Sequence, residues 1–261
     1  MENKVDIVIQ GNLWDCTIQA ATRYADLDFV NKVYISTWKE ERKRTQSYPP
    51  NNKIHYVFSE LPSHEGGNNV NYQIVSSKNG ILASDCEVVV KMRSDQIVST
   101  KSMYDMYNFR NEFMERKSSL TMDPKPQEHL FTLGVGTHYP YHPQDHILWG
   151  HREDLLNFFS LPLSPFPSLG PIDPFKTTLR ANIYLGVHYF SKYDKDAQKH
   201  IDKPELYLLD EAPKFKESMI TSEKIIHKLF KAFPKIDLYW EKYKSGYLYD
   251  FYKKQGECYD E

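Results

Sequence analysis

Four short runs rich in valine and isoleucine recur in the first hundred residues, and they are continuous rather than alternating. They are VDIVIQ (5–10), KVYIST (32–37), KIHYVFS (53–59) and EVVVKMR (87–93). Continuous apolar runs are typical of parallel strands that are covered on both faces. Helix-sized segments begin near Asp15 and within NNVNYQIVSSKNGILAS. We therefore expect an open, mostly parallel sheet with right-handed crossovers.

The remainder of the chain predicts further helices and strands. Apolar spacing predicts helices over 102–116, 152–159, TLRANIYLGVHYFSK and 222–233, strands in LFTLGVG and DHILWG, and a proline-rich loop or lid over 161–174. The expected class is α/β, a Rossmann-like sheet flanked by helices, with residues 1–200 as the catalytic domain. Residues 201–261 are expected to form a helical extension packed on it. The aromatic and lysine-rich end of that extension is also compatible with peripheral contact at a membrane surface.

Composition narrows the class of partner. The chain has 261 residues, 26% of them charged, and a formal net charge of -2, which argues against nucleic acid as a ligand. Cys16, Cys86 and Cys258 show neither disulfide nor metal-site spacing, as expected in a reducing compartment. No apolar run approaches the length of a membrane span, and the first residues lead directly into a strand. We expect a cytoplasmic protein.

Polar residues gather where the predicted strands end. Ligands of open parallel sheets bind beyond the carboxyl ends of the strands. Those ends hold Gln10 and Gly11 after the first strand, Thr37 and Trp38 at the second, and RSDQ (93–96) at the fourth. Neither a GxGxxG nor a GxxxxGK[ST] motif follows the first strand, which disfavours a dinucleotide dehydrogenase and a P-loop enzyme. Trp38 has two interpretations, as a platform for a nucleobase or as a packed aromatic residue.

The sequence VVVKMRSDQ carries the most specific candidate chemistry. On a strand, Lys91, Arg93 and Asp95 share one face, and the last two stand at the carboxyl end. A carboxylate there can hold Mn²⁺ or Mg²⁺ together with substrate phosphates, and a guanidinium matches phosphate oxygens bidentately. The alternative is a structural ion pair between Arg93 and Asp95.

A second group of polar residues opens the helix near Asn68. Its free amides and positive dipole end point towards the same crevice. Asn69 and Gln73 fall one turn apart on one face, and Asn71 lies between them. We expect all three to contact the ligand.

A histidine-rich loop follows in the sequence THYPYHPQDH. His138, His142 and His146 have the spacing of a zinc-binding helix, but Pro140 and Pro143 interrupt it. A metal-dependent hydrolase using this loop therefore remains one alternative function. A non-catalytic nucleotide- or carbohydrate-binding module is another.

The ordered series IVIQG, STWK, GGNNVNYQIVSSKNG, VVKMRSDQ and DHILWG resembles the WavE family of lipopolysaccharide-synthesis proteins over about the first 150 residues. The resemblance implies a glycosyltransferase of the GT-A type, with a nucleotide-sugar donor and a glycan or lipid-linked saccharide acceptor. Arg-x-Asp at 93–95 stands where GT-A enzymes carry their DxD metal motif, so Asp95 becomes the implied ligand of Mn²⁺ or Mg²⁺.

The resemblance also implies roles for residues outside the first sheet strands. Asp145 is the first choice for catalytic base, with Asp173 and Asp154 in reserve. The acceptor or sugar is implied to contact His146, Trp149 and Asn182. Tyr72 stands where the family pattern has an arginine, which leaves Arg93 to bind phosphate alone.

Overall fold

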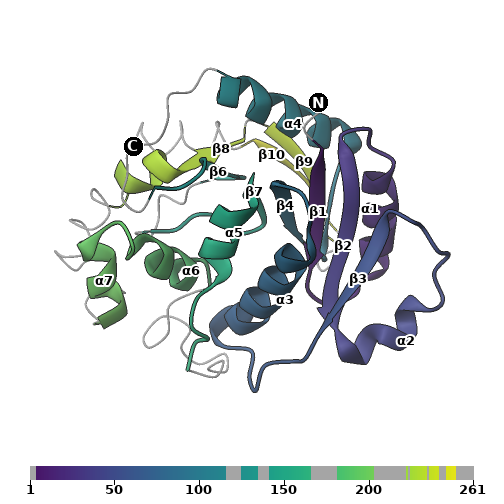
Figure 1. Cartoon of the computed structure of the whole chain (residues 1–261), viewed down its shortest axis with the longest axis horizontal. Coiled ribbons are helices and arrows are strands. Elements are labelled where there is room, and N and C mark those ends of the chain that lie inside the picture. Colours follow the sequence, from purple (N-terminus) through teal and green to yellow (C-terminus); the bar gives the residue numbers. More distant parts are fainter. Residues whose placement is uncertain are drawn as a thin grey trace.

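A mostly parallel sheet flanked by helices forms the centre of the computed structural model (Figure 1). The structure describes residues 4–115, 125–134, 141–165, 181–202, 222, 224–233, 235–240 and 245–250. Within them, seven strands follow the order β3-β2-β1-β4-β7-β6-β8, and a smaller sheet has the order β10-β9-β5. The predicted α/β class with a Rossmann-like half is confirmed.

The described elements have the following bounds. The strands are β1 (Val5–Gln10), β2 (Val30–Trp38), β3 (Ile54–Ser59), β4 (Val88–Arg93), β5 (Gln96–Val98), β6 (Leu130–Thr132), β7 (Ile147–His151), β8 (Phe230–Ala232), β9 (Lys235–Trp240) and β10 (Ser245–Asp250). The helices are α1 (Asp15–Ala25), α2 (Arg42–Thr45), α3 (Val70–Ala83), α4 (Thr100–Glu115), α5 (Arg152–Phe159), α6 (Ala181–Phe190) and α7 (Lys195–Asp202), with 3-10 turns at Lys39–Glu41 and Gly67–Asn69.

The first four strands are the four apolar runs of the sequence. β1 pairs in parallel with both β2 and β4, and β2 pairs in parallel with β3. β7 then joins β4 in antiparallel orientation. Because β1 is covered on both faces, every one of its residues is buried.

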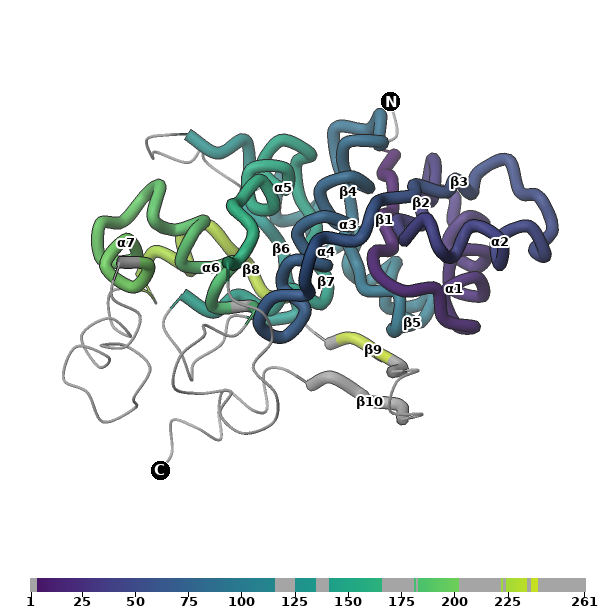
Figure 2. The backbone as a smooth tube through the Cα atoms, turned by 90° about the horizontal axis from the view of Figure 1, so that it is seen from below, coloured from purple at the N-terminus to yellow at the C-terminus, as the bar shows by residue number. Residues whose placement is uncertain are grey.

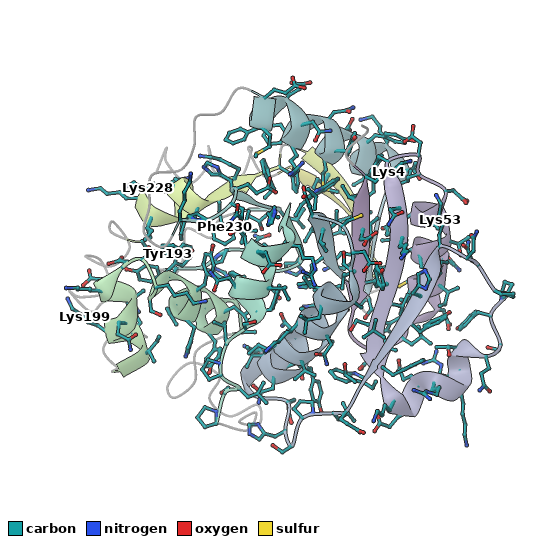
Figure 3. All side chains as sticks on the ribbon, in the orientation of Figure 1. Lys4, Lys53, Tyr193, Lys199, Lys228 and Phe230 are labelled. Atoms are coloured by element: carbon teal, nitrogen blue, oxygen red, sulfur yellow. The ribbon has the colours of Figure 1, made fainter. Side chains whose placement is uncertain are left out.

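Two hydrophobic cores lie on opposite faces of the sheet. Ile7 and Ile9 of β1 face the core that α1 and α4 cover, whereas Val8 faces the core formed with α3, α5 and α6. This alternation along one strand is the period-two geometry of β structure. Figure 3 shows Phe230 among the elements of the second core, while Lys199 and Lys228 point outward.

The C-terminal residues differ from the predicted helical extension. β8 enters the large sheet beside β6, and β9 pairs in antiparallel orientation with both β5 and β10. Figure 2 shows β9 apart from the large sheet. Ile236 and Leu238 are buried on either side of Asp237, an alternation typical of a strand. Residues 224–229 are helical, as expected, but the prediction of a helical extension is wrong for β8, β9 and β10. β5 offers β9 an edge that no local pattern reveals.

Other expectations fall partly outside the described residues. The proline-rich segment is described only as far as residue 165, so the predicted lid over 161–174 remains a prediction. Within the described parts of the chain, no helix has the length and apolar character needed to cross a bilayer.

A buried carboxylate at the amino end of β1 ties three segments together. Oδ1 of Asp6 accepts hydrogen bonds from Asn31 Nδ2 and from the Lys32 amide, both at 3.0 Å. Oδ2 accepts from Ser84 Oγ at 2.7 Å and from the amides of Asp85 and Cys86 at 3.2 Å. Asp6 thus joins β1 to the start of β2 and to the turn that enters β4.

Replacement of this carboxylate should destabilise the fold. Asp6→Asn keeps the shape of the side chain but directs an NH₂ group towards groups that are themselves hydrogen-bond donors. We expect the free energy of unfolding to fall by roughly 2 to 4 kcal/mol, the range for breaking a buried charged network. Urea unfolding measures the loss. Asp26→Asn, at an exposed position that ends α1, is the matched control, and equal midpoints for the two variants would contradict the role of Asp6.

Candidate active site

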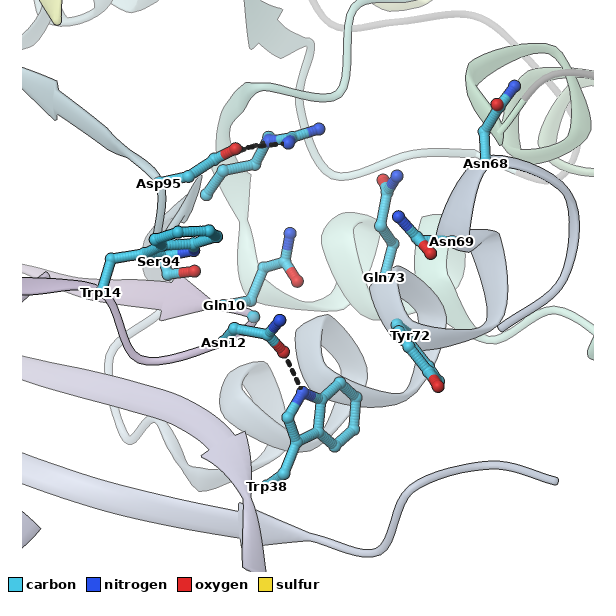
Figure 4. Close-up of a pocket in the computed structure, with 12 residues that line it drawn as sticks. Gln10, Asn12, Trp14, Trp38, Asn68, Asn69, Tyr72, Gln73, Ser94 and Asp95 are labelled. Carbon is cyan, nitrogen blue, oxygen red and sulfur yellow. Dashed lines mark hydrogen bonds and ion pairs between the residues drawn. The ribbon is translucent and has the colours of Figure 1, made fainter. Parts of the chain in front are cut away.

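A pocket of about 240 Å³ opens at the carboxyl ends of β1 and β4. β1 continues through α1 to β2 on one side, and β4 lies on the other side of β1, so the pocket occupies the point where the strand order reverses. Figure 4 shows the side chains that surround it. The residues lining the pocket are Gln10, Gly11, Asn12, Trp14, Trp38, Asn68, Asn69, Tyr72, Gln73, Arg93, Ser94 and Asp95.

Backbone contacts fix the turn that follows β4. The Ser94 amide donates to the Gln10 carbonyl at 2.9 Å, and Thr17 Oγ1 of α1 donates to the Ser94 carbonyl at 2.8 Å. Gly11 has a φ of 121°, and a Cβ there would lie 2.7 Å from Ser94 Oγ. Only glycine fits that backbone and that spacing, so Gly11 allows the two strand ends to approach closely.

Arg93 and Asp95 form an ion pair. This is the alternative that the sequence analysis set beside a metal- and phosphate-binding role. Arg93 Nε donates to Asp95 Oδ1 at 2.9 Å, and Arg93 Nη2 donates to Oδ2 at 2.7 Å (dashed in Figure 4). The Asp95 side chain is 7% exposed and that of Arg93 26% exposed. This is the bidentate geometry that a planar guanidinium and a carboxylate favour.

Aromatic side chains form the other end of the pocket. The rings of Trp38 and Tyr72 lie 5.2 Å apart, and Trp14 also lines the wall. Trp38 Nε1 donates to Asn12 Oδ1 at 2.7 Å. Because an indole N–H can only donate, this bond assigns the Asn12 oxygen to Trp38 and leaves the amide NH₂ as the donor group. Trp38 itself is largely buried, so it both packs and borders the pocket.

The start of α3 contributes amide side chains. Asn68 and Asn69 adopt left-handed backbone angles, with φ of 51° and 62°, in the 3-10 turn before the helix. Asparagine tolerates that conformation better than most residues. Asn69 and Gln73 line the pocket as predicted, whereas Asn71 does not. Asn71 instead exchanges two hydrogen bonds with the Ser164 backbone, at 3.1 and 2.7 Å.

Glu41 is a residue that the sequence analysis missed. Its Oε2 accepts hydrogen bonds from the Leu13 amide at 2.5 Å and from Thr37 Oγ1 at 2.7 Å. Thr37 is fully buried and donates to Glu41. It does not line the pocket, where its predicted contact with the donor would occur. A glutamate in a charged stretch after a strand gives no local signal of such a role.

Beside the pocket lies a group of buried ionisable residues. Lys91 Nζ donates to the backbone carbonyl of Asp145 at 2.5 Å, and burial lowers the pKa of Lys91 to about 8. Burial alone raises the pKa of Asp145, but the positive charges around it, first that of Lys91, together outweigh burial, so the pKa lies below its usual value. Asp145 is 1% exposed, and among the described residues neither carboxylate oxygen has a hydrogen-bond partner.

His146 adjoins this group through the pairing of β4 with β7. Met92 pairs with Ile147, which brings the preceding His146 next to Arg93. His146 Nδ1 lies 2.7 Å from Gln96 Nε2, and burial lowers the pKa of His146 to about 4. The imidazole is therefore neutral at pH 7.

Other predicted site residues lie elsewhere. Trp149 is fully buried in the core and stacks against Phe29 at 6.3 Å, so its predicted contact with a sugar is wrong in this structure. Asp154 accepts hydrogen bonds from the amides of Gln127 and Glu128 and serves as an anchor for that loop rather than as a base. His138, Asp173 and the side chain of Asn182 lie outside the described residues.

The pocket wall does not fit the divalent metal that the sequence resemblance implies. Mn²⁺ and Mg²⁺ need several oxygen ligands, usually including carboxylates. Asp95 is the only carboxylate among the lining residues, and both its oxygens bond to Arg93. Among the residues that the structure describes, no three potential metal ligands of the types His, Cys, Asp and Glu converge.

The family model described as "WavE lipopolysaccharide synthesis" matches residues 31–177, more than half of the chain. The chain belongs to this family. The resemblance expected from the sequence motifs is thereby confirmed. The match includes β2, α3, the Arg93–Asp95 turn and β7, which together carry most of the pocket and the ionisable group beside it. No curated protein matches the sequence.

Several solved structures share a limited likeness with this WavE family member. 4-Diphosphocytidyl-2C-methyl-D-erythritol synthase from Anaerococcus prevotii has a TM-score of 0.39 and 9% identity, over 87% of this chain and 100% of that one. TarS from S. aureus has a TM-score of 0.40 and 13% identity, over 73% and 34%. An active-site mutant of LgtC has a TM-score of 0.35 and 13% identity, over 58% and 59%.

The low pKa of His146 predicts a pH dependence of stability. The unfolded chain takes up a proton near pH 6.5, whereas folded His146 resists protonation until about pH 4. The free energy of unfolding should therefore fall as the pH drops from 6.5 towards 4, because the unfolded state binds more protons in that window. Buried His200, whose pKa burial also lowers to about 4, adds a change of the same sign.

Urea midpoints at pH 7.5 and 5.0 test this prediction. His146→Gln should show a smaller decrease between the two pH values than the natural protein. His55→Gln, which alters an exposed histidine, is the control. An unchanged decrease in His146→Gln would contradict the assignment of a buried neutral imidazole.

Proposed function

We propose that this WavE family member is a glycosyltransferase that moves a sugar from a nucleotide-sugar donor to a glycan or lipid-linked saccharide. The observation that carries the proposal is the pocket at the ends of β1 and β4, which joins an aromatic end to a cationic and amide-rich end. A nucleoside diphosphate has the same division, with a flat base at one end and anionic oxygens at the other. The family description, lipopolysaccharide synthesis, supports a saccharide as acceptor.

In this proposal the base binds at the aromatic end. Trp38 and Tyr72 offer ring faces and edges, and the Asn12 amide supplies donors to carbonyl or ring-nitrogen acceptors. The diphosphate then lies towards Arg93, with Gln73 of α3 and Asn69 of the preceding turn on the opposite wall. Gln10 is held in place by Ser76 Oγ, which donates to its Oε1 at 2.7 Å.

Transfer of the sugar requires stabilisation of the departing diphosphate. Arg93 supplies a fixed positive charge where negative charge develops on the leaving group, the arrangement that lowers a barrier most effectively. The proposed base is Asp145, ionised beside Lys91. Its two carboxylate oxygens have no hydrogen-bond partner among the described residues. Buried carboxylates without such partners are rare and cluster at functional sites. His146 is the proposed neighbour of the acceptor.

Finer parts of the proposal concern the sugar and the place of action. The transferred group is a hexose or pentose, and the protein works in the cytoplasm, with peripheral contact to the membrane that carries a lipid-linked acceptor. These parts rest on the cysteine pattern and on the family description.

A panel of nucleotides tests the proposal directly. UDP, GDP, CDP and TDP are added separately, and we expect one of them to raise the thermal unfolding midpoint, because a ligand that binds only the folded state stabilises it. The matching nucleotide sugars should then be hydrolysed slowly, which a non-catalytic binding module would not do. No thermal shift with any of the four would contradict the proposal.

Asp145→Asn separates catalysis from donor binding. Removing the base should lower the rate of transfer or of donor hydrolysis by about 10²- to 10⁴-fold, the usual contribution of general-base catalysis. The affinity for the nucleoside diphosphate should stay within about threefold, since Asp145 does not line the pocket. Asp26→Asn, which makes the same change at an exposed position away from the pocket wall, is the control and should keep the natural rate. A rate within tenfold of the natural protein would remove Asp145 from the mechanism.

A further inference from the structure

The ion pair between Arg93 and Asp95 determines how the pocket meets an anionic ligand. The guanidinium engages both oxygens of the carboxylate, at 2.9 and 2.7 Å, and both residues line the pocket. The turn between them is held through Ser94, by Gln10 on one side and Thr17 on the other. The pair is therefore a rigid part of the wall and not a chance contact of two mobile surface side chains.

A divalent cation that bound Asp95 would have to compete with Arg93 for the carboxylate. It would displace one or both guanidinium bonds and would then lie next to the permanent positive charge of Arg93. The other side chains of the described wall are amides, a hydroxyl and aromatic rings, which are neutral. One carboxylate that is already neutralised is a poor donor set for Mn²⁺ or Mg²⁺.

The same pair suits direct binding of phosphate. An arginine whose guanidinium plane is fixed by a carboxylate loses little side-chain freedom when it binds an oxyanion. Asp95 thus has the features of a positioning residue, since it sets the plane and place of Arg93. The amide side chains of Asn69 and Gln73 lie across the pocket and add neutral hydrogen-bonding groups (Figure 4).

We infer that this pocket binds the diphosphate of its ligand through Arg93, oriented by Asp95, without a divalent cation between protein and phosphate. The inference rests on the proposed function, because it concerns the same pocket and the same class of ligand. It assigns Asp95 to Arg93 and departs from the metal-ligand role that the Arg-x-Asp sequence implies.

Calorimetric titration of the full chain with UDP, GDP, CDP and TDP tests the inference, each in EDTA and in MnCl₂. We expect the dissociation constant of the nucleotide that binds to agree within about threefold between the two conditions, a difference of under 1 kcal/mol. A loss of more than tenfold in EDTA would overturn the inference and leave the proposed function standing. Absence of binding in both conditions would instead contradict the proposed function, and the inference with it.

Two variants sharpen the test. Arg93→Asp places two carboxylates on the turn, so binding in EDTA should weaken more than tenfold and recover in part with MnCl₂. Asp95→Asn keeps an oxygen that accepts from Arg93, so binding should weaken only a few-fold and equally in both conditions. If Asp95→Asn instead removes a stimulation by MnCl₂, Asp95 is a metal ligand and the inference is wrong.

A matched control accounts for the change in charge. Arg23→Asp makes the same substitution on the exposed surface of α1, away from the pocket wall. It should leave nucleotide binding unchanged in EDTA and in MnCl₂. Unfolding midpoints of all variants establish that they are folded, and a loss of binding by Arg23→Asp equal to that of Arg93→Asp would show that net charge, not the pair, determines affinity.

Discussion

The hydrogen bonds to Asp6 are the interaction on which the site depends. One carboxylate inside a parallel sheet accepts from the start of β2 and from the turn into β4, and so sets both neighbours of β1 at their amino ends. Strands that begin in fixed register and have similar lengths also end together. Gln10 and Arg93 are consequently paired at the far end of β1 and β4, and the pocket lies over that pair.

The sequence was sufficient to locate the pocket but not to predict the place of every residue around it. Continuous valine and isoleucine runs gave the first four strands, and the rule that ligands bind at strand ends gave Gln10, Trp38 and Arg93. The roles of Asp6 and Glu41 were not predicted, because every partner of Asp6 and the Leu13 partner of Glu41 lie far away along the chain. The family resemblance implied that Trp149 contacts a sugar, yet its place in β7 directs it into the core. Local sequence patterns predict which residues tend to be buried, whereas the contacts of Asp6, Glu41 and Trp149 depend on their neighbours in the folded protein.

The contrast between Arg93 and Lys91 shows how two cations on one strand acquire different roles. Both belong to the same face of β4, two residues apart. Lys91 is buried beside Asp145 and Phe159, whose ring lies 5.3 Å from Nζ, and its charge is balanced within the protein. Arg93 reaches the pocket and keeps its charge at any accessible pH. Two positions on one face of the strand thus hold a buried structural cation and a cation that lines the pocket.

The pairing of β9 with β5 joins two segments that lie far apart in the sequence. The Ser99 amide donates to the Asp237 carbonyl, and the Asp237 amide donates to Ser102 Oγ at 2.8 Å, across 138 and 135 residues. β5 begins at Gln96, immediately after the turn that bears Arg93 and Asp95. As the ribosome makes the chain from the amino terminus, that turn emerges long before β9. Its partner strand on this side is therefore missing until β9 has been made, and up to that point in synthesis the wall of the pocket lacks the support that β9 gives to β5.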